Sequence, residues 1–331
     1  HQTFGCIRQR GVYGDKIRVL ENCIDGDEVD FERSQVFTGD IRVKAEHFHL
    51  QAFRAFYQEY LARGLAADLK YLSRPERFNP LSILPSARTL LLFFYPYRFR
   101  AVEDKQRTTP FKIARYAWQK DYHLSLRAKL TRVLTELTLT GRAVTDSAPL
   151  FERYWARRAG MGFVGKNGML IDRASGSYFF IAAALIEEGV ETRGDIPLRR
   201  EARPLTDDFS EICKDCRLCV DSCPTGALFG DGLMQTEKCI SYRTIETKAP
   251  AAYAHGDKKH RWIFGCDICQ QVCPYNKTAA SFAQDMFNDE HPVVAQIAAG
   301  ADLPARARLK ESVFLRRGPA KLRENIAALE P

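Results

Sequence analysis

The first half of the chain alternates between helical and extended patterns of apolar residues. Over residues 45–69, aromatic and aliphatic side chains recur every three or four positions, which predicts an amphipathic helix that ends near Gly64. Residues 89–95 are almost continuously apolar and predict a buried strand. A second amphipathic helix is predicted over 122–139, with these side chains facing inward: Leu124, Leu126, Leu130, Val133, Leu134 and Leu137.

A glycine-rich segment follows and leads into two further predicted strands. Residues 146–159 predict a turn and a helix, whereas 169–172 and 178–185 predict strands. The segment between them contains glycines that let the backbone approach a ligand closely: Gly160, Gly162, Gly165 and Gly168. The polar, proline-containing stretch 187–210 predicts a linker, so the first domain is expected to end near residue 200.

Composition places the chain among ordinary globular proteins. Its 331 residues are enough for two domains, and 45% hydrophobic with 27% charged residues is compatible with a buried core. No apolar run approaches the ~18 residues that a membrane span needs, and the first 21 residues lack an apolar signal core. We therefore expect a cytoplasmic protein that does not enter a membrane.

The net charge of +8 includes a basic stretch near the C-terminus. Such a stretch could follow a phosphate backbone, or it could be the solvated face of a helix. Charge alone leaves both interpretations open. The stretch consists of Arg306, Arg308, Lys310, Arg316, Arg317, Lys321 and Arg323.

Eight of the ten cysteines lie between residues 213 and 273 in ferredoxin-like spacing. The first run has gaps of two, two and three residues and ends in Cys-Pro. In two-cluster ferredoxins, the fourth cysteine of such a run binds the other cluster. We therefore predict two [4Fe–4S] clusters. One is bound by Cys213, Cys216, Cys219 and Cys273, and the other by Cys223, Cys239, Cys266 and Cys269.

Zinc is the alternative ligand for these cysteines, because paired Cys-x-x-Cys units also build tetrahedral zinc sites. The Cys-Pro endings and the three-cysteine start of the first run favour clusters. Cys6 and Cys23 stand outside the pattern and are interpreted as ordinary thiols. Cluster ligation also favours a reducing cytoplasm over a secreted disulfide framework.

Five stretches carry a resemblance to a known family. Residues 145–167 read TDSAPLFERYWARRAGMGFVGKN, and the other four read RFNPLSILP from Arg77, RYAWQKDYH from Arg115, CISYRTIE from Cys239 and FGCDICQQVCPYNK from Phe264. With these stretches the chain resembles the epoxyqueuosine reductases. The resemblance implies a mixed α/β (α+β) cobalamin-binding domain of flavin-reductase-like fold over 45–200. A small ferredoxin-type α+β module over 201–280 and a basic helical tail over 281–331 would follow, and residues 1–44 are unmatched.

The resemblance also implies an activity and its partners. Members of this family reduce epoxyqueuosine to queuosine in a tRNA anticodon loop, and electrons pass from the two clusters to cobalamin. Removing an epoxide oxygen requires two electrons and protonation of that oxygen, and a corrin cobalt can collect electrons that clusters deliver singly. An external donor such as flavodoxin or ferredoxin would supply these electrons. We expect the protein to act as a monomer.

Asp146 matches the family's proton donor. Without the resemblance, an aspartate in this context would be interpreted as a helix N-cap. A donor at neutral pH needs a raised pKa, so we expect burial or a nearby corrin face to raise the pKa of Asp146. His123 opens a predicted helix and is interpreted as structural. The predicted cobalamin contacts are Arg77, Tyr116, Lys166, Asn167 and Ser241.

Two other functions are compatible with parts of the sequence. A corrinoid reductive dehalogenase would also pair cobalamin with a ferredoxin-like module, but such enzymes usually carry a twin-arginine export signal. Here Arg8 and Arg10 are separated by Gln9, and no apolar segment follows. A non-catalytic electron carrier needs only the cysteine module, and the matched acid Asp146 in a large first domain argues against it.

Overall fold

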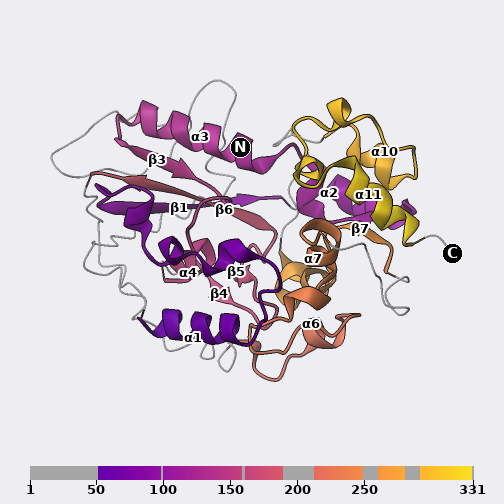
Figure 1. Ribbon diagram of the computed structural model, residues 1–331, viewed down its shortest axis with the longest axis horizontal. Coiled ribbons are helices and arrows are strands. Elements are labelled where there is room, and N and C mark those ends of the chain that lie inside the picture. Colours follow the sequence, from indigo (N-terminus) through magenta and orange to yellow (C-terminus); the bar gives the residue numbers. More distant parts are fainter. Residues whose placement is uncertain are drawn as a thin grey trace, which may run out of the picture.

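The computed structural model describes residues 51–97, 100–158, 161–188, 212–248, 260–279 and 291–329 (Figure 1). The unmatched segment 1–44, with Cys6 and Cys23, lies outside these residues, as do Gly160 and the predicted boundary near residue 200. Within the described part of the chain, no helix combines the length and the apolar character needed to cross a membrane.

A three-stranded antiparallel sheet lies at the centre of the first half. Its middle strand is β6 (Phe179–Ile186), which pairs with β1 (Thr89–Pro96) on one side and with β3 (Gly141–Val144) on the other. The strands predicted at 89–95 and 178–185 are confirmed. Their antiparallel pairing shows that the mixed α/β domain is not built from parallel crossovers around this sheet.

Helices cover both faces of this sheet, which explains why β1 is buried at every position. Leu91 and Phe93 belong to the core beneath α3 (Tyr122–Glu136), whereas Leu90 and Leu92 face the opposite core. The opposite core includes side chains of α1 (Gln51–Ala62) and α4 (Glu152–Arg158). Figure 1 shows α3 on one side of the sheet and α4 on the other.

The two predicted amphipathic helices are present with shorter bounds. The first stops before Gly64, whose φ of 68° suits glycine and ends the helix. The second begins after Asp121, whose side chain accepts a hydrogen bond from the His123 amide and caps the helix. The prediction that Leu124 faces inward is wrong, because it is 51% exposed. At 3.6 residues per turn, Leu124 lies roughly 160° around the helix from the buried Leu126.

Short elements complete the first half. They are α2 (Arg100–Thr108), β2 (Lys112–Ile113), β4 (Phe163–Val164) and β5 (Leu170–Ile171), with the 3₁₀ turns η2 (Lys70–Ser73), η3 (Pro75–Phe78), η4 (Pro80–Ser82) and η5 (Arg115–Trp118). Strands β4 and β5 form an antiparallel pair within the glycine-rich segment.

The cysteine module joins the first half through a short parallel strand pair. Its elements are α6 (Leu218–Asp221), η7 (Thr236–Lys238), α7 (Ile240–Ile245), β7 (Trp262–Phe264), α8 (Ile268–Gln271) and α9 (Pro274–Thr278). Strand β7 pairs with β2. Directly after β7, a Cβ on Gly265 would lie 2.5 Å from the Cβ of Ala114, so glycine permits this close approach.

The C-terminal segment packs onto both halves. It contains α10 (Val294–Ala298), η10 (Arg306–Leu309), η11 (Val313–Arg316) and α11 (Gly318–Ala327). Phe314 and Leu322 are buried in the same core as β1 and α3. The fully buried Asn325 donates hydrogen bonds to the carbonyl oxygens of Thr244 (2.9 Å) and Ile263 (2.8 Å). The predicted basic tail is therefore an integral part of the fold.

Candidate active site

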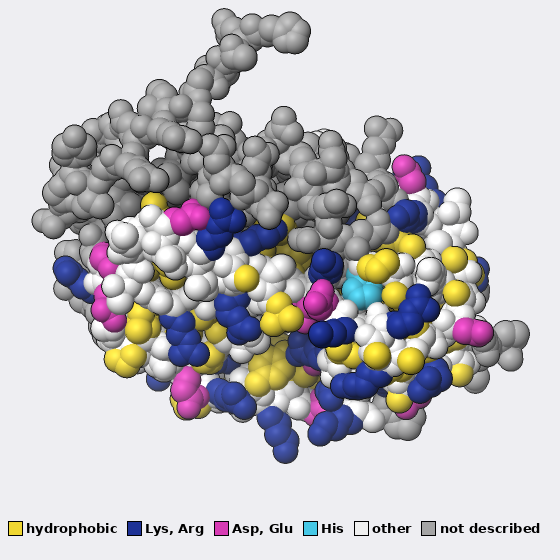
Figure 2. Space-filling view, turned by 90° about the horizontal axis from the view of Figure 1, so that it is seen from above, with side chains coloured by type: hydrophobic (Ala, Val, Ile, Leu, Met, Phe, Trp, Pro, Cys, Tyr) yellow, Lys and Arg dark blue, Asp and Glu magenta, His cyan; other side chains and the backbone are white. Residues whose placement is uncertain are grey.

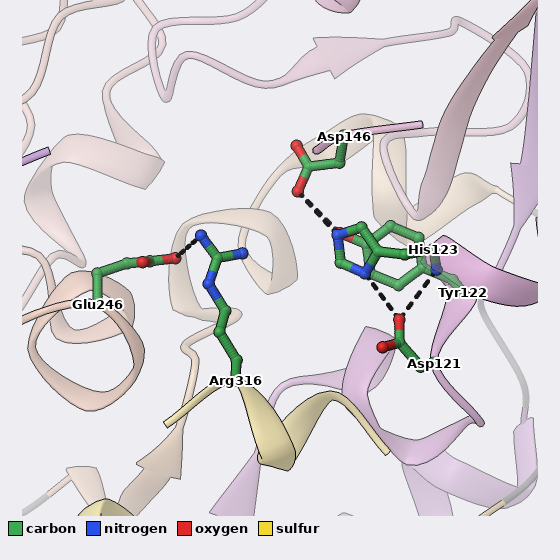
Figure 3. A network of polar contacts seen from close by, with 6 residues as sticks. All are labelled: Asp121, Tyr122, His123, Asp146, Glu246 and Arg316. Atoms are coloured by element: carbon green, nitrogen blue, oxygen red, sulfur yellow. Dashed lines mark hydrogen bonds and ion pairs between the residues drawn. The ribbon is translucent and has the colours of Figure 1, made fainter. Parts of the chain in front are cut away.

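Asp146 lies in the loop between β3 and α4 and does not cap a helix. The Ala148 amide donates to the Thr145 carbonyl and closes a turn there, and α4 begins only at Glu152. The Asp146 carboxylate points toward the start of α3 (Figure 3). Its Oδ2 accepts a hydrogen bond of 3.0 Å from the Tyr122 hydroxyl and lies 3.4 Å from His123 Nε2. The side chain is 57% exposed, so a substrate can reach it.

His123 is held between two carboxylates. Its Nδ1 lies 2.7 Å from Oδ1 of Asp121, and its Nε2 faces Asp146. Burial alone would lower the pKa of His123, but the hydrogen bonds to Asp121 and Asp146 outweigh burial and raise it to about 9. His123 is therefore a cation at neutral pH. The sequence interpretation of His123 as structural missed this contact with Asp146.

The surroundings of Asp146 lower its pKa. The protein atoms packed around the carboxylate desolvate it and would raise the pKa, although the side chain is 57% exposed. The hydrogen bond and positive charge of His123, the Tyr122 hydroxyl and the charge of Arg316 outweigh this and lower the pKa to about 2. The expectation that burial raises the pKa of Asp146 is therefore wrong for the polypeptide alone. In the polypeptide alone at neutral pH, Asp146 is a carboxylate, and the neighbouring His123 imidazolium carries the proton.

Arg316 approaches Asp146 from the C-terminal segment (Figure 3). Its Nη2 forms an ion pair of 2.8 Å with Oε1 of Glu246, which follows α7. Burial would lower the pKa of Arg316, and Glu246 and Asp146 raise it. The next residue, Arg317, donates to the carbonyl oxygens of Ile245 (3.2 Å) and Glu246. Arg316 and Arg317 of the basic stretch thus bind other parts of the protein.

Two of the predicted cobalamin contacts lie beside this site. Tyr116 packs its ring edge-on against Tyr122, with the ring centres 6.1 Å apart. Burial raises the pKa of Tyr116, with smaller effects from Arg316 and Asp146. Arg77 donates to the Leu150 carbonyl at 3.2 Å, and its guanidinium lies 4.8 Å from the ring centre of Phe151.

Three buried polar atoms near Asp146 have no hydrogen-bond partner among the described residues. They are Nε of Arg77, Oγ1 of Thr145 and Oε1 of Glu152. Burial and then the charge of Asp146 raise the pKa of Glu152 to about 8, so it is largely protonated at neutral pH. Unpaired buried polar atoms are costly unless a ligand satisfies them. This set of donors and acceptors fits a ligand fringed with amides, such as a corrin.

The other three predicted cobalamin contacts lie against the cysteine loops. Lys166 donates to the carbonyl oxygens of Lys214 and Cys216, the latter at 3.2 Å. Asn167 donates to the Cys269 carbonyl at 3.3 Å. The backbone amide of Ser241 hydrogen-bonds to the sulfur of Cys239. The contacts of Lys166 and Asn167 connect the glycine-rich segment to the cysteine module, whereas that of Ser241 lies within the module. Cobalamin binding by these three residues stays a prediction.

The eight cysteines form two neighbourhoods. Burial raises the pKa of Cys219 to about 11, and the neighbouring thiols of Cys213, Cys273 and Cys216 add to the rise. Burial raises the pKa of Cys266 as well, and the thiols that add to it are Cys239 and Cys223. Burial and then Cys266 and Cys239 raise the pKa of Cys269, and Cys219 of the first neighbourhood contributes as well. The two neighbourhoods therefore adjoin at Cys219 and Cys269, and the assignment of each cysteine to one cluster stays a prediction.

Backbone amides donate hydrogen bonds to the cysteine sulfurs. Ala227 donates to Cys223 at 3.4 Å, and Tyr275 and Asn276 donate to Cys273. Such bonds stabilise thiolates and tune the potential of an iron–sulfur cluster.

A zinc ion binds four thiolates around one point, whereas a cubane binds each thiolate through a different iron. In the part of the chain that the structure covers, no three metal-binding side chains meet at one point.

Comparison with known proteins assigns the family. A family described as a 4Fe–4S double cluster binding domain matches residues 212–276, and epoxyqueuosine reductase QueG, DUF1730, matches residues 77–147. A Synechocystis epoxyqueuosine reductase is 34% identical over 287 residues, covering 82% of this chain and 93% of the relative. The chain belongs to the epoxyqueuosine reductase family. The family assignment agrees with the resemblance carried by the five sequence stretches.

Solved epoxyqueuosine reductase structures share this fold. One, determined with an epoxyqueuosine-modified tRNA-Tyr stem loop, is 26% identical with a TM-score of 0.64, covering 84% of this chain and 74% of that one. Another, from Bacillus subtilis, is 27% identical with a TM-score of 0.60, covering 83% and 74%. In that reductase a catalytic loop carrying an aspartate is swung out of the active site. In this epoxyqueuosine reductase family member, Asp146 lies in the loop between β3 and α4, and its side chain is exposed.

Proposed function

We propose that this protein reduces epoxyqueuosine to queuosine in a tRNA anticodon loop. The observation that carries the proposal is the position of Asp146, an exposed carboxylate with Tyr122 and His123 on one side and Arg316 nearby. The cysteine module that supplies Glu246 adjoins the same site. Family membership and the solved relative with a modified tRNA stem loop support the same reaction.

The proposed cofactors are those that the cysteines and the polar side chains near Asp146 could bind. The eight cysteines would hold two [4Fe–4S] clusters, which accept electrons one at a time from an external donor such as flavodoxin or ferredoxin. Bound cobalamin would supply a cobalt that collects two electrons and acts on the epoxide. The unpaired polar atoms of Arg77, Thr145 and Glu152 would meet its amides. Tyr116, Lys166, Asn167 and Ser241 remain its further proposed contacts.

Asp146 and its neighbours would donate the proton, orient the carboxylate and supply positive charge. Asp146 would protonate the leaving oxygen, and Tyr122 would orient the carboxylate through its hydroxyl. Arg316 is fixed by Glu246 and contributes positive charge beside the carboxylate. The protein would act on its tRNA as a monomer in the cytoplasm.

A single-turnover assay tests this function. The protein is purified anaerobically, loaded with iron, sulfide and cobalamin, reduced chemically, and mixed with tRNA that carries epoxyqueuosine. Visible spectra report the loading of clusters and corrin, and nucleoside mass spectrometry reports queuosine. We expect one queuosine per loaded active site. Fully loaded protein that forms no queuosine would contradict the proposal, and turnover of a halogenated organic substrate instead would favour a dehalogenase.

We expect tRNA binding to use exposed basic residues of η10. Lys and Arg side chains are spread over the face seen in Figure 2. Arg306 and Arg308 are exposed, whereas Arg317 is bonded to backbone carbonyls. The double variant Arg306→Gln/Arg308→Gln should weaken tRNA binding and reduce the slope of log affinity against log salt by up to about 2. Filter binding over a salt series measures this.

Arg63→Gln is the matched control for tRNA binding. Arg63 follows α1 directly and has an exposed side chain, 3.9 Å from Glu59. Figure 1 shows α1 and α11 on different sides of the molecule. Loss of Arg63 should leave the salt slope unchanged. An unchanged slope in the double variant would instead assign η10 to ordinary solvated surface.

A further inference from the structure

We propose that His123 is a positioning residue that supplies a proton to Asp146 through the contact between them, while Asp121 holds the imidazole in place. The inference deepens the proposed reductase function and rests on it. It assigns a role to three residues at the start of α3 that the sequence did not connect with the chemistry.

The geometry fixes both ring nitrogens of His123. Asp121 Oδ1 accepts from the His123 backbone amide at 3.0 Å and lies 2.7 Å from Nδ1, so one carboxylate oxygen sets both the helix start and the ring orientation. Nε2 then faces Oδ2 of Asp146 at 3.4 Å. The ring stacks on Tyr122 at 4.1 Å between centres, and Tyr122 stacks on Phe180 at 3.9 Å.

A ring with a carboxylate at each nitrogen is best satisfied when both nitrogens donate, and only the imidazolium does this. The charged and titratable groups around His123 and Asp146 come from every element packed there. They are Asp121, Tyr122, Tyr116, Tyr71, Glu152, Glu246 and Arg316. Burial opposes the imidazolium, but the two carboxylates prevail and raise the pKa of His123 to about 9. His123 thus holds a proton at neutral pH that Asp146 lacks.

The proposed reaction requires more protons than one aspartate can hold. Removal of an epoxide oxygen as water breaks two C–O bonds, forms a C=C bond and consumes two electrons and two protons. The external one-electron donor supplies both electrons through the cofactors. Asp146 is a carboxylate at neutral pH, so it must gain a proton before it can pass one to the leaving oxygen. A neighbouring donor must therefore supply Asp146 with a proton within the turnover.

His123 is placed to deliver this proton. The proton moves from Nε2 of His123 to Oδ2 of Asp146 and from there to the leaving oxygen. The neutral imidazole of His123 stays hydrogen-bonded to Asp121. It regains a proton from solvent, because the His123 side chain is 21% exposed. The Tyr122 hydroxyl orients the same Oδ2 but holds its proton too tightly to release it, since burial and Asp146 raise its pKa well above the ordinary value.

The pH dependence tests the inference. Protonated His123 is the competent form, so the single-turnover rate should persist below pH 9 and fall as the pH rises through about 9. In His123→Gln the rate at saturating tRNA should fall about 10- to 100-fold at neutral pH, and this alkaline limb should disappear. The KM for tRNA should stay the same, and added imidazole should restore part of the rate.

Tyr122→Phe is the matched control for His123→Gln. It also removes one hydrogen bond to Asp146, but it leaves the imidazole in place. Its rate should fall less, and its alkaline limb should persist. If the rate of His123→Gln fell with rising pH as it does in wild type, the proposed proton transfer from His123 to Asp146 would be overturned. A purely structural histidine would lower the rate without changing the pH profile.

Proton NMR titration of His123 provides a readout that does not depend on turnover. In the folded protein without substrate, the Cε1 proton of His123 should titrate near pH 9 and shift toward the ordinary value of about 6.5 in Asp146→Asn. Titration near 6.5 in wild type would overturn the relay. Absence of queuosine formation by fully loaded wild type, with His123 still titrating near 9, would overturn the proposed function instead.

Discussion

Replacing Asp146 with asparagine should reduce single-turnover queuosine formation by about 1,000-fold or more. The amide cannot pass a proton to the leaving oxygen, and loss of a positioned general acid costs roughly 10²- to 10⁴-fold. The change is nearly isosteric, and the amide oxygen of the new side chain could still accept a hydrogen bond from Tyr122. Anaerobic single-turnover kinetics with nucleoside mass spectrometry measures the loss, and visible spectra should show unchanged clusters and corrin.

Asp104→Asn is the control for this substitution. Asp104 lies on α2, is exposed and forms a long ion pair of 3.9 Å with Arg107, so its neutralisation should leave the rate within about twofold. An electron carrier predicts a different result for Asp146→Asn, because full electron transfer needs no acid there. Queuosine formation at the wild-type rate in Asp146→Asn would contradict the role of this residue.

The variants Cys219→Ser and Cys269→Ser should each lose one of the two clusters. Each cubane contains four irons on four thiolates, so iron per chain should fall from about eight to about four and donor-driven queuosine formation should stop. Both side chains lie inside the module, where burial raises the pKa of each thiol, so unloaded protein should also be less stable. Iron analysis and low-temperature EPR of the reduced protein measure the loss.

The pairing of variants tests the ligand grouping. Cys273→Ser should reproduce the EPR spectrum of Cys219→Ser, whereas Cys223→Ser should reproduce that of Cys269→Ser. Cys6→Ser and Cys23→Ser are the controls and should retain about eight irons. Loss of iron in either control would show that the assignment of eight ligands is incomplete, and a protein that binds zinc in place of iron would contradict the clusters.

Much of the local structure could be predicted from the apolar pattern. The strands near β1 and β6 and the helices α1 and α3 follow from periodicity, because each buries a stripe or a full set of side chains. The antiparallel order of the sheet could not be predicted in this way. Strand β6 pairs with β1, which lies about 90 residues earlier along the chain, and periodicity contains no information about such partners.

The site illustrates the same limit. The cysteine spacing predicts two clusters because Cys-x-x-Cys runs that end in Cys-Pro are easily recognised in a sequence, and the grouping of the eight ligands stays a prediction. Asp146 was predicted only through the family resemblance, and the low pKa that its neighbours impose was not. Those neighbours come from α3 and from residue 316, and only the folded chain brings them together. The short Asp-x-His spacing at 121–123 was the one local signal for His123.

The position of Arg316 and Asn325 late in the chain has a consequence for biosynthesis. Both come after the cysteine runs, and Asn325 anchors α11 on carbonyl oxygens of α7 and β7. Synthesis proceeds from the N-terminus, so the thiols leave the ribosome before these residues do. A nascent chain therefore exposes its cysteines before Arg316 can reach Asp146 and before α11 can dock on α7 and β7.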